Sequence, residues 1–354
     1  MWLVKIILYP FACLYGGLTH LRNKFFDWHL LCSKRFDLPV ISVGNLSAGG
    51  SGKTPHVEYL VRLLDAYHIA IVSRGYRRKT KGYLKARPGH KLDELGDESL
   101  QYLNKFPGVT IAVDERRRRG IEKALRDDPE IQVILLDDAF QHRYVKPGLS
   151  ILLTDYHHLY TKDYLMPTGT LREWRSGAKR ADIIVVTKTP KIFSPLIRRE
   201  LIEAISARKY QKLFFSYVAY DTPVPLKITG ITTPAAAKPA YIVMVAGVAN
   251  SYPMQEYLRD FCGELTVIDF DDHHEYEDQD LDKIFKSFDS IISKDKVIFT
   301  TEKDAMRFEK EEFSSRLAGK PIYYLPIRVK FHPSEEIKFD DVILNYVAKA
   351  GRDH

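Results

Sequence analysis

Short apolar runs alternate with helical-period segments along the first part of the chain. Residues 54–67 show the helical pattern, because apolar side chains recur there at the three- and four-residue spacing of one helix face. Apolar runs of strand length recur at 39–43, 69–73, 109–113, 131–136, 149–154 and 183–187. This alternation predicts an α/β fold, with a mostly parallel sheet flanked by helices on both faces.

A second group of apolar runs follows, and the chain of 354 residues is long enough for two domains. Residues 221–240, rich in Pro, Thr and Ala, separate the groups as a linker or a surface excursion. We expect a first domain over 31–212 and a second, smaller α/β domain over 213–354, closed by a helix at 334–349. The second group of runs lies at 213–218, 241–246, 264–269, 296–300 and 321–329.

Residues 1–30 differ from both domains. Their apolar run is interrupted by Lys5, Pro10 and two glycines, so it is short for a membrane-spanning helix of ~20 residues. It also lacks the small-residue cleavage site of a signal peptide. Aromatic side chains mix here with Arg22 and Lys24, which suits the surface of a membrane. A helix packed on the core is the alternative.

Charge and cysteine content narrow the class of protein. The formal net charge of +7 favours an anionic partner, which includes nucleic acid, an acidic membrane surface and a phosphorylated substrate. No recognised nucleic-acid module accompanies that charge. Cys13, Cys32 and Cys262 fit neither a zinc spacing nor a disulfide framework, so we expect reduced thiols in a cytoplasmic protein.

The segment GNLSAGGSGKTP, residues 44–55, follows an apolar run and precedes a helical pattern. Its glycines allow successive backbone N–H groups to surround an anion, and a helix N-terminus adds its dipole. Lys53 supplies a charge for the β- and γ-phosphates, and the Thr54 hydroxyl is a ligand for Mg²⁺. Ser47 stands where the strict phosphate-loop pattern has its first glycine. The expected nucleotide-binding residues are Ser47, Ala48, Gly49, Gly50, Ser51, Gly52, Lys53 and Thr54.

A pair of aspartates supports this interpretation. Asp137 and Asp138 end the apolar run 131–136, and phosphate-loop enzymes hold Mg²⁺ with an aspartate in that position. The sequence does not say which of the two lies nearer the ion. Residues 187–190, Thr-Lys-Thr-Pro, carry proline where a guanine-reading aspartate would stand, so we expect ATP rather than GTP.

The motifs together resemble the tetraacyldisaccharide 4′-kinase family, over the chain from its N-terminal segment to about residue 308. That resemblance implies a kinase that transfers the γ-phosphoryl of Mg-ATP to the 4′-hydroxyl of a tetraacyl glucosamine disaccharide 1-phosphate in lipopolysaccharide biosynthesis. It also explains Ser47, because the family has Thr or Ser there, whereas Ala139 replaces the family's usual glycine. The motifs are VGNLSAGGSGKTP, VSRGY at 72–76, GDE at 96–98, LLDDAFQHR at 135–143, MPTGTLRE at 166–173, DDHH at 271–274 and TTEKDAMRF at 300–308.

The resemblance also implies roles for single residues. Asp97 is the expected general base, and His273 is its expected partner, although Asp97 without the family would be read as an ordinary helix start. Arg172 is expected to hold the transferring phosphoryl group or the acceptor. Further family positions around the nucleotide and acceptor are Arg74, Gln141, His142 and Glu173, together with Arg117 in the run 116–119, for which a solvated helix face is the alternative. TEKDAM, 301–306, receives no chemical role.

The family works at the cytoplasmic face of the bacterial inner membrane as a peripheral enzyme, so the resemblance favours the membrane-surface role of residues 1–30. Three alternatives stay open at this stage. One is a phosphate-loop GTPase or cofactor-insertion protein, and another is a nucleotide-gated membrane-binding protein, which would need Lys53 and Thr54 but not Asp97. The third is a metal cluster at 271–275, although the adjacent histidines of an extended segment point to opposite faces.

Overall fold

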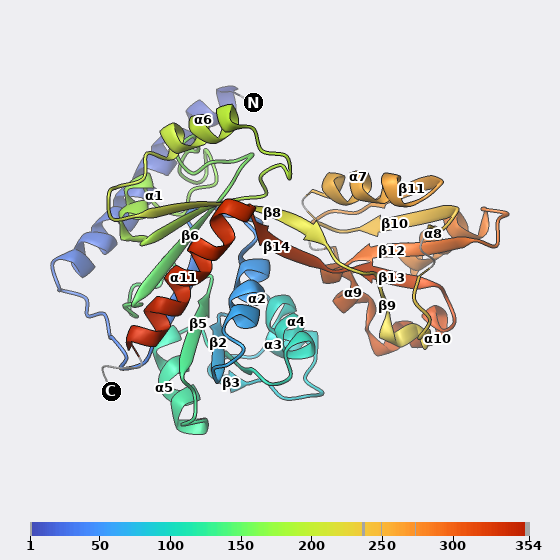
Figure 1. Cartoon of the computed structure of the whole chain (residues 1–354), viewed down its shortest axis with the longest axis horizontal. Helices are drawn as coiled ribbons and strands as arrows, with labels where there is room; N and C mark the ends of the chain where they lie inside the picture. The colour runs from blue at the N-terminus through green and yellow to red at the C-terminus, as the bar shows by residue number, and fades with distance from the viewer. Residues whose placement is uncertain (1, 236–237, 249, 273, 351–354) are drawn as a thin grey trace. The chain divides into compact units, whose positions relative to one another are not determined.

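The computed structural model describes residues 2–235, 238–248, 250–272 and 274–350, and the chain divides into two compact units (Figure 1). Unit 1 comprises Met1–Val218 and Val329–His354, and unit 2 comprises Ala219–Arg328. The chain therefore passes into unit 2 once and returns once.

Unit 1 is built on a sheet in which nine strands are described, in the order β14-β8-β7-β6-β1-β5-β2-β4-β3. The pairs from β8 to β4 are parallel, and β3 is antiparallel to β4. The strands are β1 Val40–Asn45, β2 Ile69–Ser73, β3 Leu84–Lys85, β4 Thr110–Val113, β5 Val133–Asp137, β6 Leu149–Asp155, β7 Ile183–Thr187, β8 Lys212–Tyr220 and β14 Ile327–Phe331.

Helices cover both faces of this sheet, as the sequence pattern predicts. On one face Val57, Tyr102 and Ile343, from three different helices, pack against Ile41 and the other inward residues of that face. The opposite face packs against three further helices in two clusters. The helices of the first face are α2 Lys53–Leu63, α4 Asp97–Lys105 and α11 Pro333–Ala350; those of the second are α1 Trp2–Asp27, α5 Arg117–Asp127 and α6 Pro195–Ile205.

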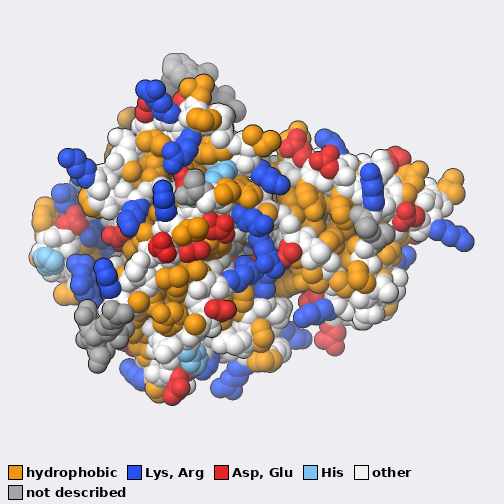
Figure 2. Space-filling view, in the orientation of Figure 1, with side chains coloured by type: hydrophobic (Ala, Val, Ile, Leu, Met, Phe, Trp, Pro, Cys, Tyr) orange, Lys and Arg blue, Asp and Glu red, His pale blue; other side chains and the backbone are white. Residues whose placement is uncertain are grey.

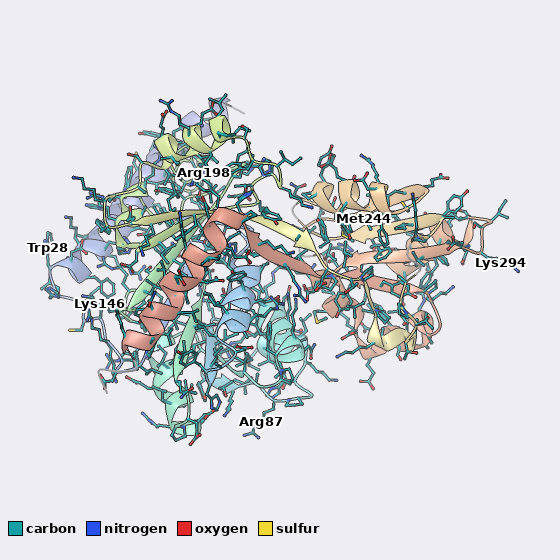
Figure 3. The ribbon with its side chains drawn as sticks, in the orientation of Figure 1. Trp28, Arg87, Lys146, Arg198, Met244 and Lys294 are labelled. Carbon is teal, nitrogen blue, oxygen red and sulfur yellow. The ribbon has the colours of Figure 1, made fainter. Side chains whose placement is uncertain are left out.

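Unit 2 has a five-stranded sheet of its own, in the order β11-β10-β12-β13-β9. Helices lie on both faces here as well, and Met244 of β10, labelled in Figure 3, is fully buried in one of the two cores. The elements are β9 Val224–Pro225, β10 Tyr241–Ala246, β11 Glu264–Asp269, β12 Lys296–Thr301, β13 Ile322–Leu325, α7 Tyr252–Phe261, α8 Asp278–Asp289, α9 Glu302–Phe308 and α10 Ser314–Leu317.

Three features of the second half differ from the sequence prediction. The run at 213–218 belongs to β8 in the sheet of unit 1, and the run 321–329 is two strands, β13 and β14, separated at Pro326, which has no N–H for a ladder. The closing helix α11 belongs to unit 1 rather than to a C-terminal domain over 213–354. Its Phe339, Ile343 and Val347 fill the core beside α2, and that burial fixes the end of the chain to the first unit.

The N-terminal segment forms one helix, α1. Its Ala12 and Phe26 are buried against unit 1, while a row of large apolar side chains at alternating four- and three-residue spacing stays exposed. That row consists of Ile7, Phe11, Leu14, Leu18 and Leu21, each at least 47% exposed, and Trp28 just beyond the helix is 60% exposed (Figure 3). Among the helices whose residues are described, none combines the length and the apolar character needed to span a bilayer.

Candidate functional site

The glycine-rich loop connects β1 to α2, and its backbone conformation requires glycine at two positions. Gly49 has a φ of 118° and Gly52, which precedes α2, a φ of 81°. Both values lie in the region that side chains with a Cβ rarely adopt. No atom lies within 4 Å of a Cβ built at Gly49 or Gly50, so this limb of the loop borders open space. The loop thus leaves room at a helix N-terminus, where backbone N–H groups attract anions.

The MPTGTLRE segment lies directly against this loop. The Ala48 N–H donates to the carbonyl of Thr170 over 2.7 Å, and the Arg172 N–H donates to the carbonyl of Leu46 over 2.8 Å. Ser47 and Leu171 form an isolated bridge between these two contacts. The glycine-rich loop and the MPTGTLRE segment, more than a hundred residues apart, are therefore joined through their backbones. This pairing places Arg172 beside the loop.

Asp138 lies between two cations of the site. Its carboxylate accepts two bonds from the Arg172 guanidinium, at 3.0 and 3.1 Å, and lies 3.6 Å from the Lys53 ammonium. Burial opposes its ionisation, but Lys53 and Arg172 outweigh burial and hold the pKa of Asp138 below its ordinary value. Its φ of 46° is sparsely populated outside glycine, although aspartate tolerates it best. The structure therefore brings Lys53, Asp138 and Arg172 together as an ionic cluster beside the loop.

Asp137 is placed differently, because it is the last residue of β5, which is the parallel neighbour of β1. It is 1% exposed, and its Oδ2 accepts a bond from the Tyr102 hydroxyl at 3.1 Å. Its Oδ1 has no hydrogen-bond partner among the described residues. Burial, followed by the charges of Glu98 and Asp138, raises the pKa of Asp137. A buried carboxylate with an orphaned oxygen at a strand end is suited to ligating a cation.

Asp97 begins α4, the helix that approaches Asp137 through Tyr102. Gly96 precedes it with a φ of 83°, and a Cβ there would stand 2.3 Å from the carbonyl oxygen of Tyr76. Only glycine therefore allows α4 to start at this point. The position of Asp97 is consistent with a helix start as well as with a base, so its catalytic role stays a prediction.

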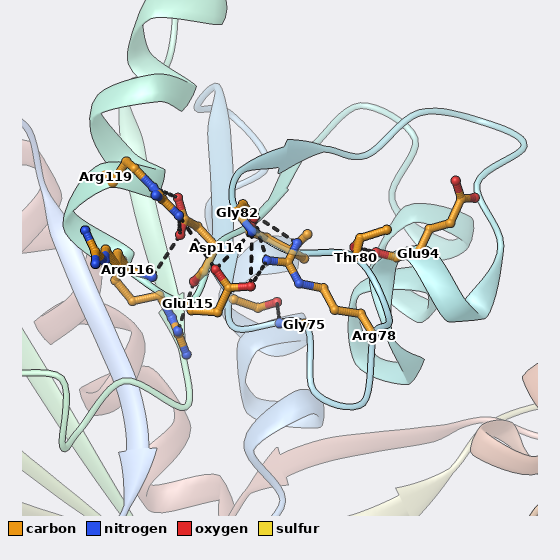
Figure 4. A network of polar contacts seen from close by, with 12 residues as sticks. Gly75, Arg78, Thr80, Gly82, Glu94, Asp114, Glu115, Arg116 and Arg119 are labelled. Atoms are coloured by element: carbon orange, nitrogen blue, oxygen red, sulfur yellow. Dashed lines mark hydrogen bonds and ion pairs between the residues drawn. The ribbon is translucent and has the colours of Figure 1, made fainter.

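The segment that leads from β2 to α4 is fixed by a polar network (Figure 4). The buried guanidinium of Arg78 pairs with Glu115 and donates to the carbonyl of Gly82. Thr80 donates to the carbonyl of Glu94, which lies just before α4. The basic stretch 77–81 is thus partly internal structure, because its Arg78 anchors this network.

The arginines of the run 116–119 do not form one solvated helix face, because Arg117 is buried. Arg117 is 2% exposed and donates to the carbonyls of Asp114 and Asp138, at 3.1 and 3.5 Å. Its Nε has no partner among the described residues, and burial lowers its pKa to about 10. Arg119 instead pairs with Asp114, as Figure 4 shows. The family position Arg117 is therefore next to the aspartate pair.

A positively charged environment surrounds His142. Its pKa is lowered to about 4, first by burial and then by the charges of Arg117, Arg22 and Arg74. Arg22 of α1 also donates to the carbonyl of Gln141 over 2.8 Å. These three arginines come from separate elements, so the fold concentrates positive charge beside the site. The face drawn in Figure 2, by contrast, shows acidic, basic and apolar side chains interspersed.

Gln141 and Glu173 serve the scaffold in this structure. The Gln141 amide donates to the carbonyl of Asn45, at the end of β1, over 2.7 Å and to Glu173 over 3.3 Å. Glu173 is buried and also accepts from Arg180 and from Asn23 of α1. This chain of bonds connects α1 to the strand that carries the glycine-rich loop.

The remaining motifs lie in unit 2. His273 falls outside the described residues, so its predicted partnership with Asp97 stays a prediction. Within the described part of the chain, no group of three or more His, Cys, Asp or Glu is arranged to hold a metal ion. In TEKDAM, the buried Asp304 accepts from the Gly247 N–H over 2.9 Å and pairs with Arg307 over 2.8 Å. That motif therefore fixes the turn after β10.

Sequence reasoning missed three residues that contact the site, namely His56, Tyr102 and Thr187. Thr187 donates to the carbonyl of Ser51 over 3.0 Å, and His56 lies within hydrogen-bond distance of the carbonyl of Gly52 at 2.7 Å. Thr187 stood in the sequence only as part of a broken guanine signature. The neighbouring Lys188 pairs with Asp155 over 2.7 Å. Thr187 and Tyr102 reach the site only through the packing of separate elements, which their spacing does not signal. His56 contacts Gly52 within one helical turn, but no recognised motif includes it.

Comparison with known proteins gives a consistent result over the whole chain. A family model described as tetraacyldisaccharide-1-P 4′-kinase matches residues 4–348. The tetraacyldisaccharide 4′-kinase of Bacteroides thetaiotaomicron is 43% identical, with 98% of this chain and 94% of the relative covered. That of Flavobacterium johnsoniae is 44% identical, with 98% of each covered. The crystal structure of "apo" form LpxK from Aquifex aeolicus in complex with ATP superposes with a TM-score of 0.74 at 27% identity, covering 97% of this chain and 99% of that one.

Proposed function

The chain belongs to the tetraacyldisaccharide-1-P 4′-kinase family, and on that premise we propose how its residues divide the work of phosphoryl transfer. The enzyme phosphorylates the 4′-hydroxyl of a tetraacyl disaccharide 1-phosphate, a lipid A precursor, at the expense of ATP. This activity replaces the two non-kinase alternatives that the sequence left open. The observation that supports the residue assignment is the ionic cluster of Lys53, Asp138 and Arg172 beside the glycine-rich loop.

The loop residues 47–54 bind the triphosphate of ATP. The N–H groups at the start of α2 face the phosphate oxygens, and the Lys53 ammonium neutralises charge on the β- and γ-phosphates. The Asp138 carboxylate, which holds Lys53 and Arg172 together here, yields these cations to the nucleotide. Arg172 then stabilises the charge on the transferring phosphoryl group.

A magnesium ion fits the residues at the end of β5 and the start of α2. The orphaned Oδ1 of Asp137 and the carboxylate of Asp138 would supply hard oxygen ligands, and the Thr54 hydroxyl would supply a third. Bound there, Mg²⁺ would neutralise negative charge on the phosphates. A cation bound there would favour the ionised form of Asp137 and so offset the burial that raises its pKa.

Asp97 accepts the proton of the 4′-hydroxyl. The hydroxyl oxygen forms a bond to the γ-phosphorus while the bond from that phosphorus to the β,γ-bridging oxygen breaks, and ADP leaves. The position of Asp97 on α4, the helix tied to Asp137 through Tyr102, supports this role. The family resemblance implies that His273 assists Asp97, and that partnership stays a prediction.

The arginines around His142 bind the negatively charged acceptor. Arg22, Arg74 and Arg117 lie close enough to His142 to lower its pKa, so they form a region of positive charge next to the aspartate pair. The disaccharide carries a phosphate at its 1-position, and arginine suits phosphate oxygens through its planar set of donors. The carbonyl of Gln141 helps to position Arg22 in this region by accepting a hydrogen bond from it.

The apolar row of α1 rests on the membrane that contains the acceptor. The row is exposed while the opposite side of α1 is held by hydrogen bonds, including one of 2.8 Å from the Tyr15 hydroxyl to the carbonyl of Arg172. Since Arg172 is a site residue, α1 connects a lipid-facing surface to the site. The enzyme would work as a peripheral protein at the cytoplasmic face of the inner membrane.

The test is transfer of labelled γ-phosphate from Mg-ATP to a tetraacyl disaccharide 1-phosphate in detergent micelles. We expect Lys53→Ala to lose transfer together with ATP affinity, and Asp97→Asn to lose at least about 100-fold in kcat with ATP affinity retained. Lys146→Ala and Asp65→Asn, which change exposed residues away from the loop, are the matched controls. Normal turnover of Asp97→Asn would remove that residue from the mechanism.

A further inference from the structure

A buried histidine in the first helical turn after the glycine-rich loop has no part in the assignments above. His56 is 4% exposed, and each of its ring nitrogens has a partner. Nδ1 lies 2.7 Å from the carbonyl oxygen of Gly52, and Nε2 lies 3.0 Å from the hydroxyl of Ser216 in β8. The ring therefore bridges the loop and β8, a strand of the same sheet as β1.

The partners determine which nitrogen carries the proton. A carbonyl oxygen only accepts, so Nδ1 must be the protonated nitrogen. The Ser216 hydroxyl is free to donate, so Nε2 is the acceptor. The ring is then neutral, in agreement with a pKa that burial lowers to about 4. One tautomer satisfies both contacts, and it presents a donor to the loop.

The side chain of Thr187 holds the carbonyl of Ser51, the residue before Gly52. The Thr187 hydroxyl, at the end of β7, donates to the carbonyl of Ser51 over 3.0 Å and is itself 1% exposed. In a trans peptide the C=O of one residue and the N–H of the next point in opposite directions. Holding the carbonyls of Ser51 and Gly52 toward β7 and α2 therefore directs the N–H groups of Gly52 and Lys53 the other way, out of the helix N-terminus.

We propose that His56 is a positioning residue for phosphoryl transfer, which with Thr187 holds two loop carbonyls so that the N–H groups of Gly52 and Lys53 face the nucleotide phosphates. This inference rests on the proposed nucleotide site. Loops with several glycines are flexible when unrestrained. The Gly52 carbonyl also accepts from the backbone N–H of His56 over 3.2 Å. The two side-chain donors add to that restraint before the nucleotide arrives, so less binding energy is lost in ordering the loop.

His56 and Thr187 together form a clamp on the carbonyls of Ser51 and Gly52. The contacts of Ser216 connect this clamp to the two strands that link unit 1 with unit 2. The Ser216 carbonyl accepts from the hydroxyl of Thr189 over 3.0 Å, and that hydroxyl lies 3.0 Å from Nε2 of His332. Ser216 lies on β8 and His332 directly follows β14, and these two strands carry the chain into unit 2 and back. The loop geometry is therefore anchored to rigid sheet positions rather than to another loop.

The experiment compares His56→Phe, which has no donor, with His56→Asn, whose amide can donate from near the position of Nδ1. We expect His56→Phe to raise the KM and the Kd for ATP about 10-fold, with the KM for the lipid acceptor unchanged. His56→Asn should stay within about 3-fold of the wild type. His68→Phe, which changes a histidine in the loop between α2 and β2, is the matched control and should leave both KM values unchanged.

Equal KM values for ATP in His56→Phe and His56→Asn would overturn the proposal, because a purely structural histidine would lower stability without this split. If His56→Phe does not fold, Thr187→Val, which replaces the hydroxyl by a methyl of similar size, carries the test. We expect it to raise the KM for ATP about 5-fold, and an unchanged KM would refute the clamp. Lys53→Ala is measured in parallel, because retained ATP affinity in that variant would show that the nucleotide site itself is misassigned.

Discussion

Asp138 and Asp137 are adjacent in the chain but lie in different electrostatic surroundings. Two cations approach one carboxylate, while Asp137 beside it is buried with an oxygen unpaired among the described residues. Burial, followed by the charges of Glu98 and Asp138, raises the pKa of Asp137. Burial opposes ionisation of Asp138 too, but Lys53 and Arg172 outweigh it and lower the pKa of Asp138. Adjacent aspartates thus differ in charge preference because their surroundings differ.

His56 gives the protein a pH dependence of stability that can be predicted in sign. Its pKa is about 4 in the folded protein, because burial disfavours the charged ring, and 6.5 in an ordinary environment. The unfolded chain therefore binds a proton before the folded protein does. The stabilisation is fully present above pH 6.5 and is lost as the pH falls from 6.5 through about 4, by about 3 kcal/mol in total.

Urea denaturation at pH 7 and pH 4.5, followed by tryptophan fluorescence, measures this loss. All three tryptophans, Trp2, Trp28 and Trp174, belong to unit 1, so the signal reports the unit that contains His56. In His56→Asn the difference in unfolding free energy between the two pH values should shrink by about 2 kcal/mol. Carboxylates titrate in both proteins and cancel in the comparison, so an unchanged difference would contradict the prediction.

At the residue scale the sequence predicted those site members that belong to continuous motifs. Lys53, Asp138 and Arg172 were all expected, and the structure places them in contact. Thr187 and Tyr102 were not expected, because their contacts join separate elements, and His56 was not expected because it belongs to no recognised motif. Residue identity alone cannot separate such a histidine from an ordinary one in a core.

The start of α4 is sensitive to a single added methyl group. A Cβ at Gly96 would stand 2.3 Å from the carbonyl oxygen of Tyr76, and the φ of 83° is strained for any other residue. We expect Gly96→Ala to displace the first turn of α4 and with it Asp97. The turnover number should fall at least about 10-fold while ATP affinity is retained, since the loop 47–54 is untouched.

Steady-state kinetics together with equilibrium binding of ATP test this expectation. Gly108→Ala is the control, because nothing lies within 4 Å of a Cβ built there and its backbone is unstrained. Wild-type turnover in Gly96→Ala would mean that α4 does not have to be held at this point for catalysis.

The exposed face of α1 allows a separate prediction about the membrane. Replacing Phe11, Leu14 and Leu18 by serine removes apolar area from the exposed row without touching the buried side of the helix. Each loss weakens partitioning into the bilayer interface by about 1 kcal/mol or more, so co-sedimentation with anionic liposomes should fall about 100-fold. Ile292→Ser removes a fully exposed isoleucine from unit 2 and is the control. Sedimentation equal to that of the wild type would favour a helix that merely packs on the core.

Most elements were predictable because their apolar runs are short and regularly interrupted. Strands β1, β2 and β4 to β7 follow the expected positions closely, since each is buried on both faces and therefore reads as a continuous apolar run. Strand β8 was assigned to the wrong sheet. Its residues show the strand pattern but not the identity of the neighbouring strand, which only the folded topology determines.

For the whole molecule, the sequence pattern indicated two α/β units but not how the chain is shared between them. The chain crosses near residue 218, close to the expected boundary, but its last strand and helix return to unit 1. A return is hard to foresee, because β14 and α11 have ordinary strand and helix patterns. Their membership is decided by the core they complete, where Phe331 and Phe339 pack beside α2.

This shared arrangement predicts that unit 1 folds without unit 2. The chain leaves through β8 and returns through β14, which are neighbours in one sheet. Just beyond β8 the Asp221 N–H donates to the carbonyl of Pro326, just before β14, over 2.9 Å, so the leaving and returning segments lie side by side. Replacing 219–328 by a short Gly-Ser linker leaves the core of unit 1 complete. The excised protein should unfold cooperatively by tryptophan fluorescence and bind ATP within about 3-fold of the wild type, because residues 47–54 and their partners all lie in unit 1. It should not transfer phosphate, since His273 has been removed.

A second deletion that also removes 329–354 is the control and should fail to fold, because it takes away Phe331, Phe339 and Ile343 from the core. If the linker protein also fails to fold, unit 2 is required for the stability of unit 1, and if it retains transfer, His273 has no part in the reaction.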